Sequence, residues 1–365
     1  MAEFIWAVGE ESSDPVVPFA GRRVRVDQME STGHLARLED DLADIARLGV
    51  SHVRYGINWR RVEPEPGRHD WELWDRAVAA CERLGLGMIV DLLHFGVPDW
   101  LSGVGDPRLP EAFLCYTEAF LGRYPGPRWF TPVNEPFVTA LMSAKLGFWN
   151  ETERSEASFM NALAGLLLAD GLASSAIRAD REARFLHAEG FGPPDRHERR
   201  TAQRLLSFDL RYGIEPSEAI APSLDLLDDR LRARLGDVAS TDGVVAGHDF
   251  YPSSGASAPD YVDLARAFHD RYRVPFMVAE TSNLGLDPSE GPGWLEGLFF
   301  AVCRLRQEGR PCLGICWYSR GDQHDWHTAL TRPVGEVTPV GLFDLTRKPR
   351  PAAATLRQLI LRGTP

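Results

Sequence analysis

Eight short apolar runs alternate with eight longer amphipathic stretches along the whole chain, and no linker separates two different compositions. Short apolar runs of this kind are typical of strands that are buried on both faces. The predicted strands are 4–9, 52–59, 87–94, 129–134, 183–189, 243–250, 274–280 and 312–318. The predicted helices are 35–48, 72–84, 110–123, 156–180, 197–212, 260–272, 294–308 and 351–362.

The stretch 35–48 illustrates how the helices are predicted. Its apolar side chains recur at the spacing that places them on one face of a helix, and Gly49 then ends the pattern. These side chains are Leu35, Leu38, Leu42, Ile45 and Leu48.

Eight consecutive βα units in 365 residues predict an α/β fold, a (β/α)8 TIM barrel formed by residues 1–365 as a single domain. The alternative is a doubly wound sheet, but no Gly-x-Gly-x-x-Gly follows the first predicted strand. In a barrel the functional side chains stand at the carboxyl ends of the strands. Polar residues do gather there: Glu10, Glu11, Arg54, Asn58, His94, Asn134, Glu135, His187, Glu189, His248, Asp249, Tyr251, Glu280 and Arg320.

Two of these strand ends carry a carboxylate in the same setting. The run Trp129-Phe-Thr-Pro-Val ends in Asn134, Glu135 and Pro136, and Val274-Pro-Phe-Met-Val-Ala ends in Glu280. Enzymes that cleave glycosidic bonds typically need two carboxyl groups at the active site, and one barrel mouth would bring these two together. Each could instead cap a following helix, since carboxylates favour helix N-termini.

The formal net charge of −12 argues against nucleic acid or an anionic membrane surface as a partner and favours a neutral ligand. The N-terminus has no basic segment followed by an apolar core, and no apolar run looks long enough to span a membrane. We therefore expect a cytoplasmic protein, and the sequence gives no indication of its oligomeric state. Buried free thiols are the simplest interpretation of the five cysteines Cys81, Cys115, Cys303, Cys312 and Cys316.

Several motifs, in the same order along the chain, resemble glycoside hydrolase family 1, the β-glucosidase group of the retaining (β/α)8 glycosidases. Thr131-Pro-Val-Asn-Glu-Pro136 is similar to its acid/base motif, and Val278-Ala-Glu-Thr-Ser-Asn283 stands where the family has Thr-Glu-Asn-Gly with the nucleophile. The other matching blocks are Leu48–Trp59, with an inward arginine, His94-Phe-Gly-Val-Pro-Asp-Trp-Leu101, and Gly247-His-Asp-Phe-Tyr-Pro252.

The chain departs from this family at positions that grip the terminal sugar. Gly9-Glu-Glu-Ser stands where the family has a sugar-binding glutamine, and Asp249 replaces an asparagine. The block from Trp317 to Trp326 is one residue longer than the family's Trp-Ser-x-x-Asp-x-x-Glu-Trp, with Asp325 in place of glutamate. The chain is also shorter than typical members, so the sugar and the linkage stay open.

The resemblance implies a retaining glycosidase without cofactor or metal, acting on a small carbohydrate, with Glu135 as acid/base and Glu280 as nucleophile. Because the nucleophile must stay ionised, we expect a cation and a hydroxyl beside Glu280, and Arg54 and Tyr251 are the candidates. Asn134 would bind the sugar 2-hydroxyl, His94 another hydroxyl, and Trp317 would form the floor of the site. The remaining candidates for sugar binding are Glu10, Asp249, Asp325 and Trp326.

Alternatives remain at this point. Arg54 could be a structural ion-pair partner, His94 and Trp317 could be core residues, and the pair His324 and His327 lacks a recognised metal-ligand spacing. If Glu10, Glu11, Asp249 and Asp325 face the site, they would select a substrate rich in donor hydroxyls or carrying an amine. The same scaffold could also serve a transglycosidase that uses the same covalent intermediate, or a non-catalytic glycan-binding barrel.

Overall fold

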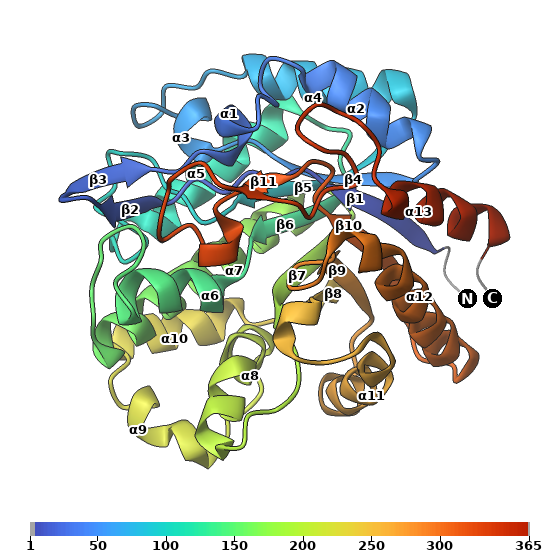
Figure 1. Ribbon diagram of the computed structural model, residues 1–365. Coiled ribbons are helices and arrows are strands. Elements are labelled where there is room, and N and C mark those ends of the chain that lie inside the picture. The colour runs from blue at the N-terminus through green and yellow to red at the C-terminus, as the bar shows by residue number, and fades with distance from the viewer. Residues whose placement is uncertain (1–3, 364–365) are drawn as a thin grey trace.

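Within residues 4–363, which the computed structural model describes, eight parallel strands pair side by side into a closed barrel (Figure 1). The order around the barrel is β1, β10, β9, β8, β7, β6, β5 and β4, with β4 closing onto β1. The predicted (β/α)8 barrel is confirmed, and the doubly wound sheet is wrong. The barrel strands are β1 Ile5–Gly9, β4 His52–Gly56, β5 Gly87–Leu93, β6 Trp129–Val133, β7 Arg184–Phe191, β8 Val244–Phe250, β9 Phe276–Thr281 and β10 Cys312–Tyr318.

The predicted helices are found with ends shifted by at most three residues, and they surround the strands (Figure 1). They are α2 Leu38–Arg47, α4 Glu72–Leu84, α5 Leu109–Arg123, α7 Glu156–Asp180, α8 Glu198–Tyr212, α11 Tyr261–Tyr272, α12 Gly291–Gln307 and α13 Pro351–Arg362. Leu35 lies before α2 and is only partly buried, whereas the other four apolar residues of its predicted face are buried.

Shorter elements that the periodicity does not predict follow several strand ends. A hairpin of β2 Val16–Phe19 and β3 Arg22–Arg25 projects from the barrel after β1 (Figure 1). The others are α1 Gln28–Ser31, α3 Trp59–Val62, α6 Pro136–Ala140, a π-helical turn at Leu141–Lys145, α9 Ala221–Leu224, α10 Asp229–Val238, and the pair β11 Gln323–His324 and β12 Val337–Thr338. Turns of 3-10 helix occupy Glu218–Ile220, Pro252–Ser254, Ala258–Asp260, Pro288–Glu290 and Trp326–Thr328.

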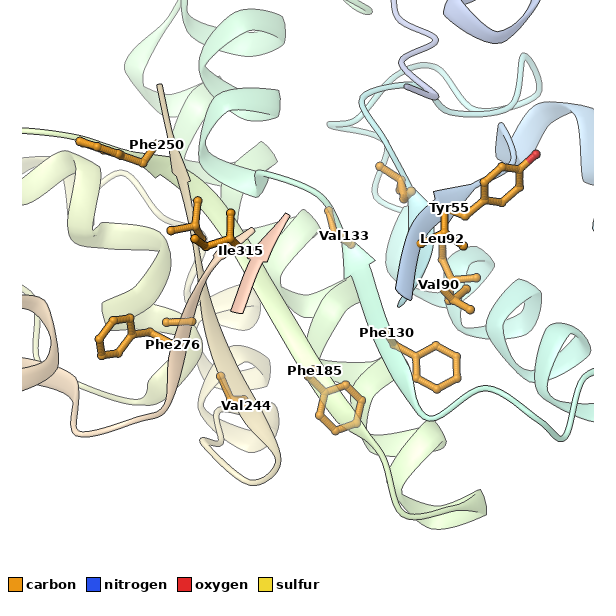
Figure 2. Close-up of a cluster of buried hydrophobic side chains, with 14 of the residues drawn as sticks. Tyr55, Val90, Leu92, Phe130, Val133, Phe185, Val244, Phe250, Phe276 and Ile315 are labelled. Atoms are coloured by element: carbon orange, nitrogen blue, oxygen red, sulfur yellow. The ribbon is translucent and has the colours of Figure 1, made fainter. Parts of the chain in front are cut away.

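Apolar side chains fill two layers, one inside the barrel and one between the strands and the helices. The inner layer is built from Ile5, Ala7, Ile89, Leu186, Ala188, Val245, Met277, Ala279 and Cys316. Figure 2 shows part of the outer layer, which includes Phe130, Phe185 and Phe276 on three of the strands. Because successive strand residues point to opposite faces, neighbours in the sequence belong to different layers. This alternation decides below which polar residues enter the barrel mouth.

Helix α7 is, among the described helices, the one long and apolar enough to cross a membrane by length and composition alone. The expectation that no apolar run reaches that length is therefore wrong. However, 72% of its most apolar window is buried inside the protein, where α7 packs on α5 and α10. A buried core helix passes the same test of length and composition.

All five cysteines are free, and four of them are buried. Cys115 on α5 is exposed, which the interpretation as buried thiols does not predict. Burial raises the pKa of the Cys81 and Cys312 thiols to about 12, so both are unreactive thiols of the core.

Candidate active site

A buried arginine stands at the centre of the barrel mouth. Arg54 on β4 is fully buried, and its guanidinium bonds one oxygen of Glu280 on β9. It also donates to Asn134 Oδ1 at 2.5 Å and pairs with Asp91 Oδ2 at 2.9 Å. Arg54 on β4 therefore joins residues from β5, from β9 and from the end of β6 around the Glu280 carboxylate.

The second oxygen of the Glu280 carboxylate accepts a hydrogen bond from the hydroxyl of Tyr251, at 2.8 Å. Tyr251 directly follows β8 and is half-buried, whereas Glu280 is only 5% exposed. The predicted contacts of Glu280 with a cation and a hydroxyl are thus both confirmed. Donors on both oxygens favour the ionised carboxylate. Both oxygens of Glu280 point to these partners and not to a helix N-terminus, so the capping interpretation of Glu280 is wrong.

Glu135 directly follows β6 in a left-handed backbone conformation, with φ 41° and ψ 61°. Residues other than glycine rarely adopt this conformation, and strained positions of this kind concentrate at functional sites. The Glu135 side chain makes no capping hydrogen bond to α6; the N–H of Phe137 is bound instead by Glu189, at 2.9 Å. Helix capping therefore does not explain the carboxylate of Glu135.

The Glu135 carboxyl lies over Gly190 on β7. A Cβ added to Gly190 would stand 3.3 Å from Glu135 Oε1, so glycine leaves room for this carboxyl. Burial, followed by the negative charges of Glu280 and Glu189, raises the pKa of Glu135 well above 4.5, against the opposing effect of Arg54. Glu135 and Glu280 are thus close enough at one mouth for their charges to interact. The surroundings of Glu135 favour its protonated form, whereas Glu280 accepts hydrogen bonds from Arg54 and Tyr251.

His94, at the end of β5, belongs to a chain of buried polar groups. Its Nδ1 lies 2.9 Å from Asp91 Oδ2, and its Nε2 lies 3.3 Å from Asn134 Nδ2 and 3.6 Å from Glu11 Oε1. Burial opposes protonation, but the negative charges of Asp91, Glu11 and Glu280 outweigh it and raise the pKa of His94 above 6.5. His94 is therefore one of the polar groups of the mouth and not an isolated core histidine.

Asp249 on β8 also faces the mouth and is 2% exposed. No N–H or O–H group in the part of the chain that the structure describes donates to its carboxylate oxygens, and the Glu135 carboxyl lies within hydrogen-bonding reach of them. Burial and the charges of Glu280 and Glu135 raise the pKa of Asp249 well above 3.8. Of the four acidic candidates left open by the sequence, Asp249 and Glu11 point into the mouth.

Trp317 does not form the floor of the site, and this prediction is wrong. Trp317 is completely buried in the outer core layer, and its indole N–H donates to the carbonyl of Val340 at 3.1 Å. Its neighbour Tyr318 points inward, with its ring stacked on His94 at a centroid distance of 5.8 Å. Gly9 must lack a side chain because a Cβ there would overlap the Tyr318 ring, 2.0 Å from one ring carbon.

The inward position of Tyr318 in place of Trp317 also explains why the block from Trp317 to Trp326 looks one residue longer than the family's motif. When Tyr318 and Ser319 are aligned with the family's Trp-Ser, the remaining positions Asp322, Asp325 and Trp326 fit Trp-Ser-x-x-Asp-x-x-Glu-Trp without an insertion. The departure is then a tyrosine in place of the first tryptophan and an aspartate in place of the glutamate. The signal for Tyr318 was present in the sequence as this alternative alignment.

Glu10 and Asp325 do not enter the mouth, and their assignment to sugar binding is wrong. The Glu10 carboxylate accepts from Arg320 Nε at 2.6 Å in a buried ion network that also holds Asp41 and His34. The Asp325 carboxylate accepts from the backbone N–H groups of Gly335 and Glu336, each at 2.9 Å, and fixes the loop that carries β12. Both residues are structural.

Trp326 is half-buried next to Phe95, with a centroid distance of 6.0 Å, and its buried indole N–H has no hydrogen-bond partner among residues 4–363. Two other strand-end residues point outward: His187 packs on Phe208 and Tyr212, and His248 donates to or accepts from Tyr261 at 2.9 Å. No group of three or more potential metal ligands is found in the described chain, His324 and His327 included.

Three residues of the mouth were missed by the site prediction: Asp91, Glu11 and Tyr318. Asp91 could have been found as the one charged residue inside the apolar run 87–94. Glu11 accepts from the N–H of Ser13 at 2.7 Å and from Gln323 Nε2 at 2.9 Å, and burial raises its pKa above 4.5. The sequence places Glu10 and Glu11 at the same strand end, and the apolar pattern of that strand does not show which of the two points into the mouth.

We expect Glu10→Gln to lower the free energy of unfolding by about 3 kcal/mol, because it removes one partner of a buried ion pair and leaves Arg320 with Asp41. Unfolding in urea measures this change. Glu11→Gln is the matched control, with a smaller loss, because glutamine resembles a protonated glutamate and can keep the bond to Ser13. Equal stability of wild type and Glu10→Gln would contradict the structural role of Glu10.

The comparison with known proteins agrees with this geometry. The model of glycosyl hydrolase family 1 matches residues 22–185, a segment that includes Glu135 but not Glu280. A β-glucosidase of an Agrobacterium species is 27% identical over 154 residues, which cover 40% of this chain and 33% of that protein. A β-galactosidase of Thermus thermophilus is 33% identical over 93 residues, covering 25% and 14%, and mouse Klotho is 26% identical over 147 residues, covering 36% and 14%. The matched segments thus span a third or less of these relatives.

The fold is shared over a greater length. A family 1 β-glucosidase from Thermotoga maritima superposes with a TM-score of 0.83 at 16% identity, covering 99% of this chain and 97% of that one. The same enzyme in complex with noeuromycin gives a TM-score of 0.85, covering 100% and 99%. The resemblance seen in the motifs is therefore confirmed in two respects: residues 22–185 are similar to glycosyl hydrolase family 1, and the chain as a whole shares the (β/α)8 fold of these β-glucosidase structures.

Proposed function

We propose that the protein is a retaining β-glycosidase that hydrolyses a terminal β-linked sugar from a small glycoside or glycoconjugate by double displacement. The observation that carries the proposal is the unequal environment of two carboxyl groups at one barrel mouth. Glu280 is bound by Arg54 and Tyr251, which favour the ionised form. Glu135 has its pKa raised by burial and by the charges of Glu280 and Glu189, which favours the protonated form.

In the first step, the Glu280 carboxylate attacks the anomeric carbon and forms an ester bond to the sugar. The bond from that carbon to the glycosidic oxygen breaks, and Glu135 gives its proton to the departing oxygen. Glu280 loses its negative charge in the ester, which removes one of the causes of the raised pKa of Glu135. Glu135 is then stable as the carboxylate that the second step requires.

In the second step, the Glu135 carboxylate takes a proton from water, and the water oxygen attacks the anomeric carbon. The ester bond breaks, and Glu280 leaves as a carboxylate that Arg54 and Tyr251 again stabilise. Two inversions at one carbon give a product with the anomeric configuration of the substrate. No cofactor is required at any stage.

The sugar would be held by the polar groups that surround this pair. Asn134 and His94 stand beside Arg54 and would contact ring hydroxyls, with Glu11 and Tyr318 behind His94. Trp326, which packs next to Phe95, would offer an indole N–H that has no partner among the described residues. These residues replace Trp317, Glu10 and Asp325 in the proposed sugar-binding set. The names of the similar proteins favour a β-linked glucoside or galactoside.

A panel of nitrophenyl β-glycosides, followed by proton NMR of the first-formed sugar, tests the proposal. We expect hydrolysis of at least one β-glycoside with the β-anomer formed first, since the covalent mechanism retains configuration. Initial formation of the α-anomer would contradict it, and binding of the sugar without hydrolysis would indicate a non-catalytic glycan-binding barrel. A second product after addition of a sugar acceptor would indicate a transglycosidase that uses the same intermediate.

We also propose a cytoplasmic location, because five unpaired cysteines suit a reducing compartment. The substrate is a small neutral carbohydrate, in line with the net charge of −12. Fractionation of cells that produce the protein, with detection by antibody, tests the location.

A further inference from the structure

The buried carboxyl of Asp249 receives no hydrogen bond from an N–H or O–H group of the described residues. It is 2% exposed, and its side chain is within hydrogen-bonding reach of the Glu135 carboxyl. A buried ionised carboxylate without a partner is very costly, so the group must be protonated or must bond to something that is protonated. Asp249 stands where the family motif that this chain resembles has an asparagine.

The strand register places Asp249 between the two proposed catalytic groups. Gly190 on β7 pairs with Asp249 on β8, and Asp249 pairs with Glu280 on β9. Neighbouring strands are about 4.8 Å apart, so these three residues form one row across the mouth. The Glu135 carboxyl lies over Gly190, 3.3 Å from where a Cβ would be, and therefore beside Asp249.

The buried carboxyl of Asp249 and the half-buried carboxyl of Glu135 cannot both be ionised without strong repulsion, and they bond to each other only through a proton. The surroundings offer few positive charges to offset a second negative one. Three charged groups of the described mouth act on both members of the pair: Glu280 and Glu189 are negative, and Arg54 is the cation. The charge of Asp249 in turn raises the pKa of Tyr251 and of Cys316. The two carboxyls therefore titrate as one unit.

From this arrangement we infer that Asp249 is a positioning residue that shares a proton with Glu135. The shared proton keeps Glu135 protonated, as acid catalysis requires. The inference rests on the proposed function of Glu135. When the pair has lost one proton, the remaining proton spends part of its time on Glu135. Acid catalysis then continues at pH values at which a lone glutamic acid would be ionised.

Asp249→Asn tests the inference through the pH dependence of kcat/KM. Asparagine keeps the shape, but its amide N–H donates to Glu135 and favours the ionised form, so Glu135 loses its proton at lower pH. With a phenyl glycoside, whose leaving group needs a proton, the alkaline limb should move to lower pH by about 1 unit or more, the scale of interaction at which two groups are coupled. An unchanged limb would overturn the inference.

Two controls separate proton sharing from a structural effect. A dinitrophenyl glycoside leaves without a proton, so Asp249→Asn should not move the alkaline limb with this substrate. An equal shift with both substrates would contradict the role through Glu135. Asp263→Asn on the exposed face of α11 makes the same chemical change, on a side chain that is 86% exposed, and should leave both profiles unchanged.

Carbon-13 NMR of wild-type protein labelled at the aspartate and glutamate carboxyls gives a reading that needs neither substrate nor a folded variant at position 249. Glu135→Gln identifies the signals. We expect Asp249 and Glu135 each to titrate in two coupled steps. Independent single steps would overturn the inference, whereas failure of the proposed function would be seen as absent turnover of every glycoside in a protein whose two carboxyls are still coupled.

Discussion

Glu280→Gln should abolish turnover of aryl β-glycosides, with a fall in kcat of about 10,000-fold or more, the scale at which loss of a nucleophile acts. Glutamine has nearly the shape of glutamate: its amide oxygen can accept from Arg54, and its amide N–H can donate to the hydroxyl oxygen of Tyr251. It cannot form the ester with the anomeric carbon. The loss corresponds to about 5 kcal/mol of transition-state stabilisation. Release of dinitrophenol measures the rate.

The choice of leaving group makes this result specific. A dinitrophenyl glycoside needs no acid for the first step, so the loss reports the nucleophile and not Glu135. Glu10→Gln is the matched control, because Glu10 is buried near the same mouth but bonds Arg320, outside the site. At a temperature below its unfolding, this variant should keep the wild-type rate. Full activity of Glu280→Gln would remove the assignment of the nucleophile.

Glu135→Ala should reduce kcat/KM for substrates with a poor leaving group by about 100- to 10,000-fold, the usual range for general acid catalysis. With a dinitrophenyl glycoside the ester should still form, and its hydrolysis should become the slow step because no base activates water. Azide should then restore turnover. Glu135 is half-buried at the mouth, so its removal opens space in which a small anion can reach the anomeric carbon.

The product identifies the mechanism of the rescue. Azide forms a bond to the anomeric carbon while the ester bond to Glu280 breaks, so the product should be the β-glycosyl azide. Chromatography and NMR of the isolated product check this. Azide should not accelerate Glu280→Gln, which forms no ester. If azide does not restore the turnover of Glu135→Ala, or if the product from this variant is the α-glycosyl azide, the assignment of Glu135 as acid/base is contradicted.

Periodicity in the sequence predicts the elements of the barrel well because each of them buries its own apolar face. Predicted strand 87–94 is observed as Gly87–Leu93, and predicted helix 72–84 as Glu72–Leu84. Residues at strand ends are confined to one mouth by the parallel closure of the barrel. Glu135 and Glu280 are 145 residues apart in the sequence, but their positions at strand ends place them together, and Arg54 and Tyr251 could be placed beside Glu280.

The direction of a side chain at a strand end was harder to predict. Trp317 and Tyr318 are neighbours, as are Glu10 and Glu11, and in each pair the residue assigned to the site is the one that points away from it. In a strand with one polar face the pattern would show which residues face the core. The barrel strands are apolar on both faces, so an error of one residue leaves the pattern unchanged and reverses every direction.

Asp325 shows a different limit. Its carboxylate is satisfied by two backbone N–H groups of residues 335 and 336, in a loop without periodicity. An aspartate in such a loop is equally suited to a sugar hydroxyl or to its own backbone, and only the path of the loop distinguishes the two. Asp249 differs from Asp325, because no backbone N–H group of the described residues donates to it. The presence of an aspartate where the family motif has an asparagine gains a functional meaning only once the structure places Asp249 beside the Glu135 carboxyl.

The order of residues alone established eight βα units, their closure into a barrel and the two carboxyl groups at its mouth, since local periodicity and strand ends are encoded over a few residues. The partners of each group depended on packing: Arg54 on Glu280, Tyr318 on His94, Glu10 on Arg320, and Asp249 beside Glu135. These contacts join strands that are distant in the chain. They follow from strand register and from which face of each strand turns inward, and neither is encoded in the local pattern.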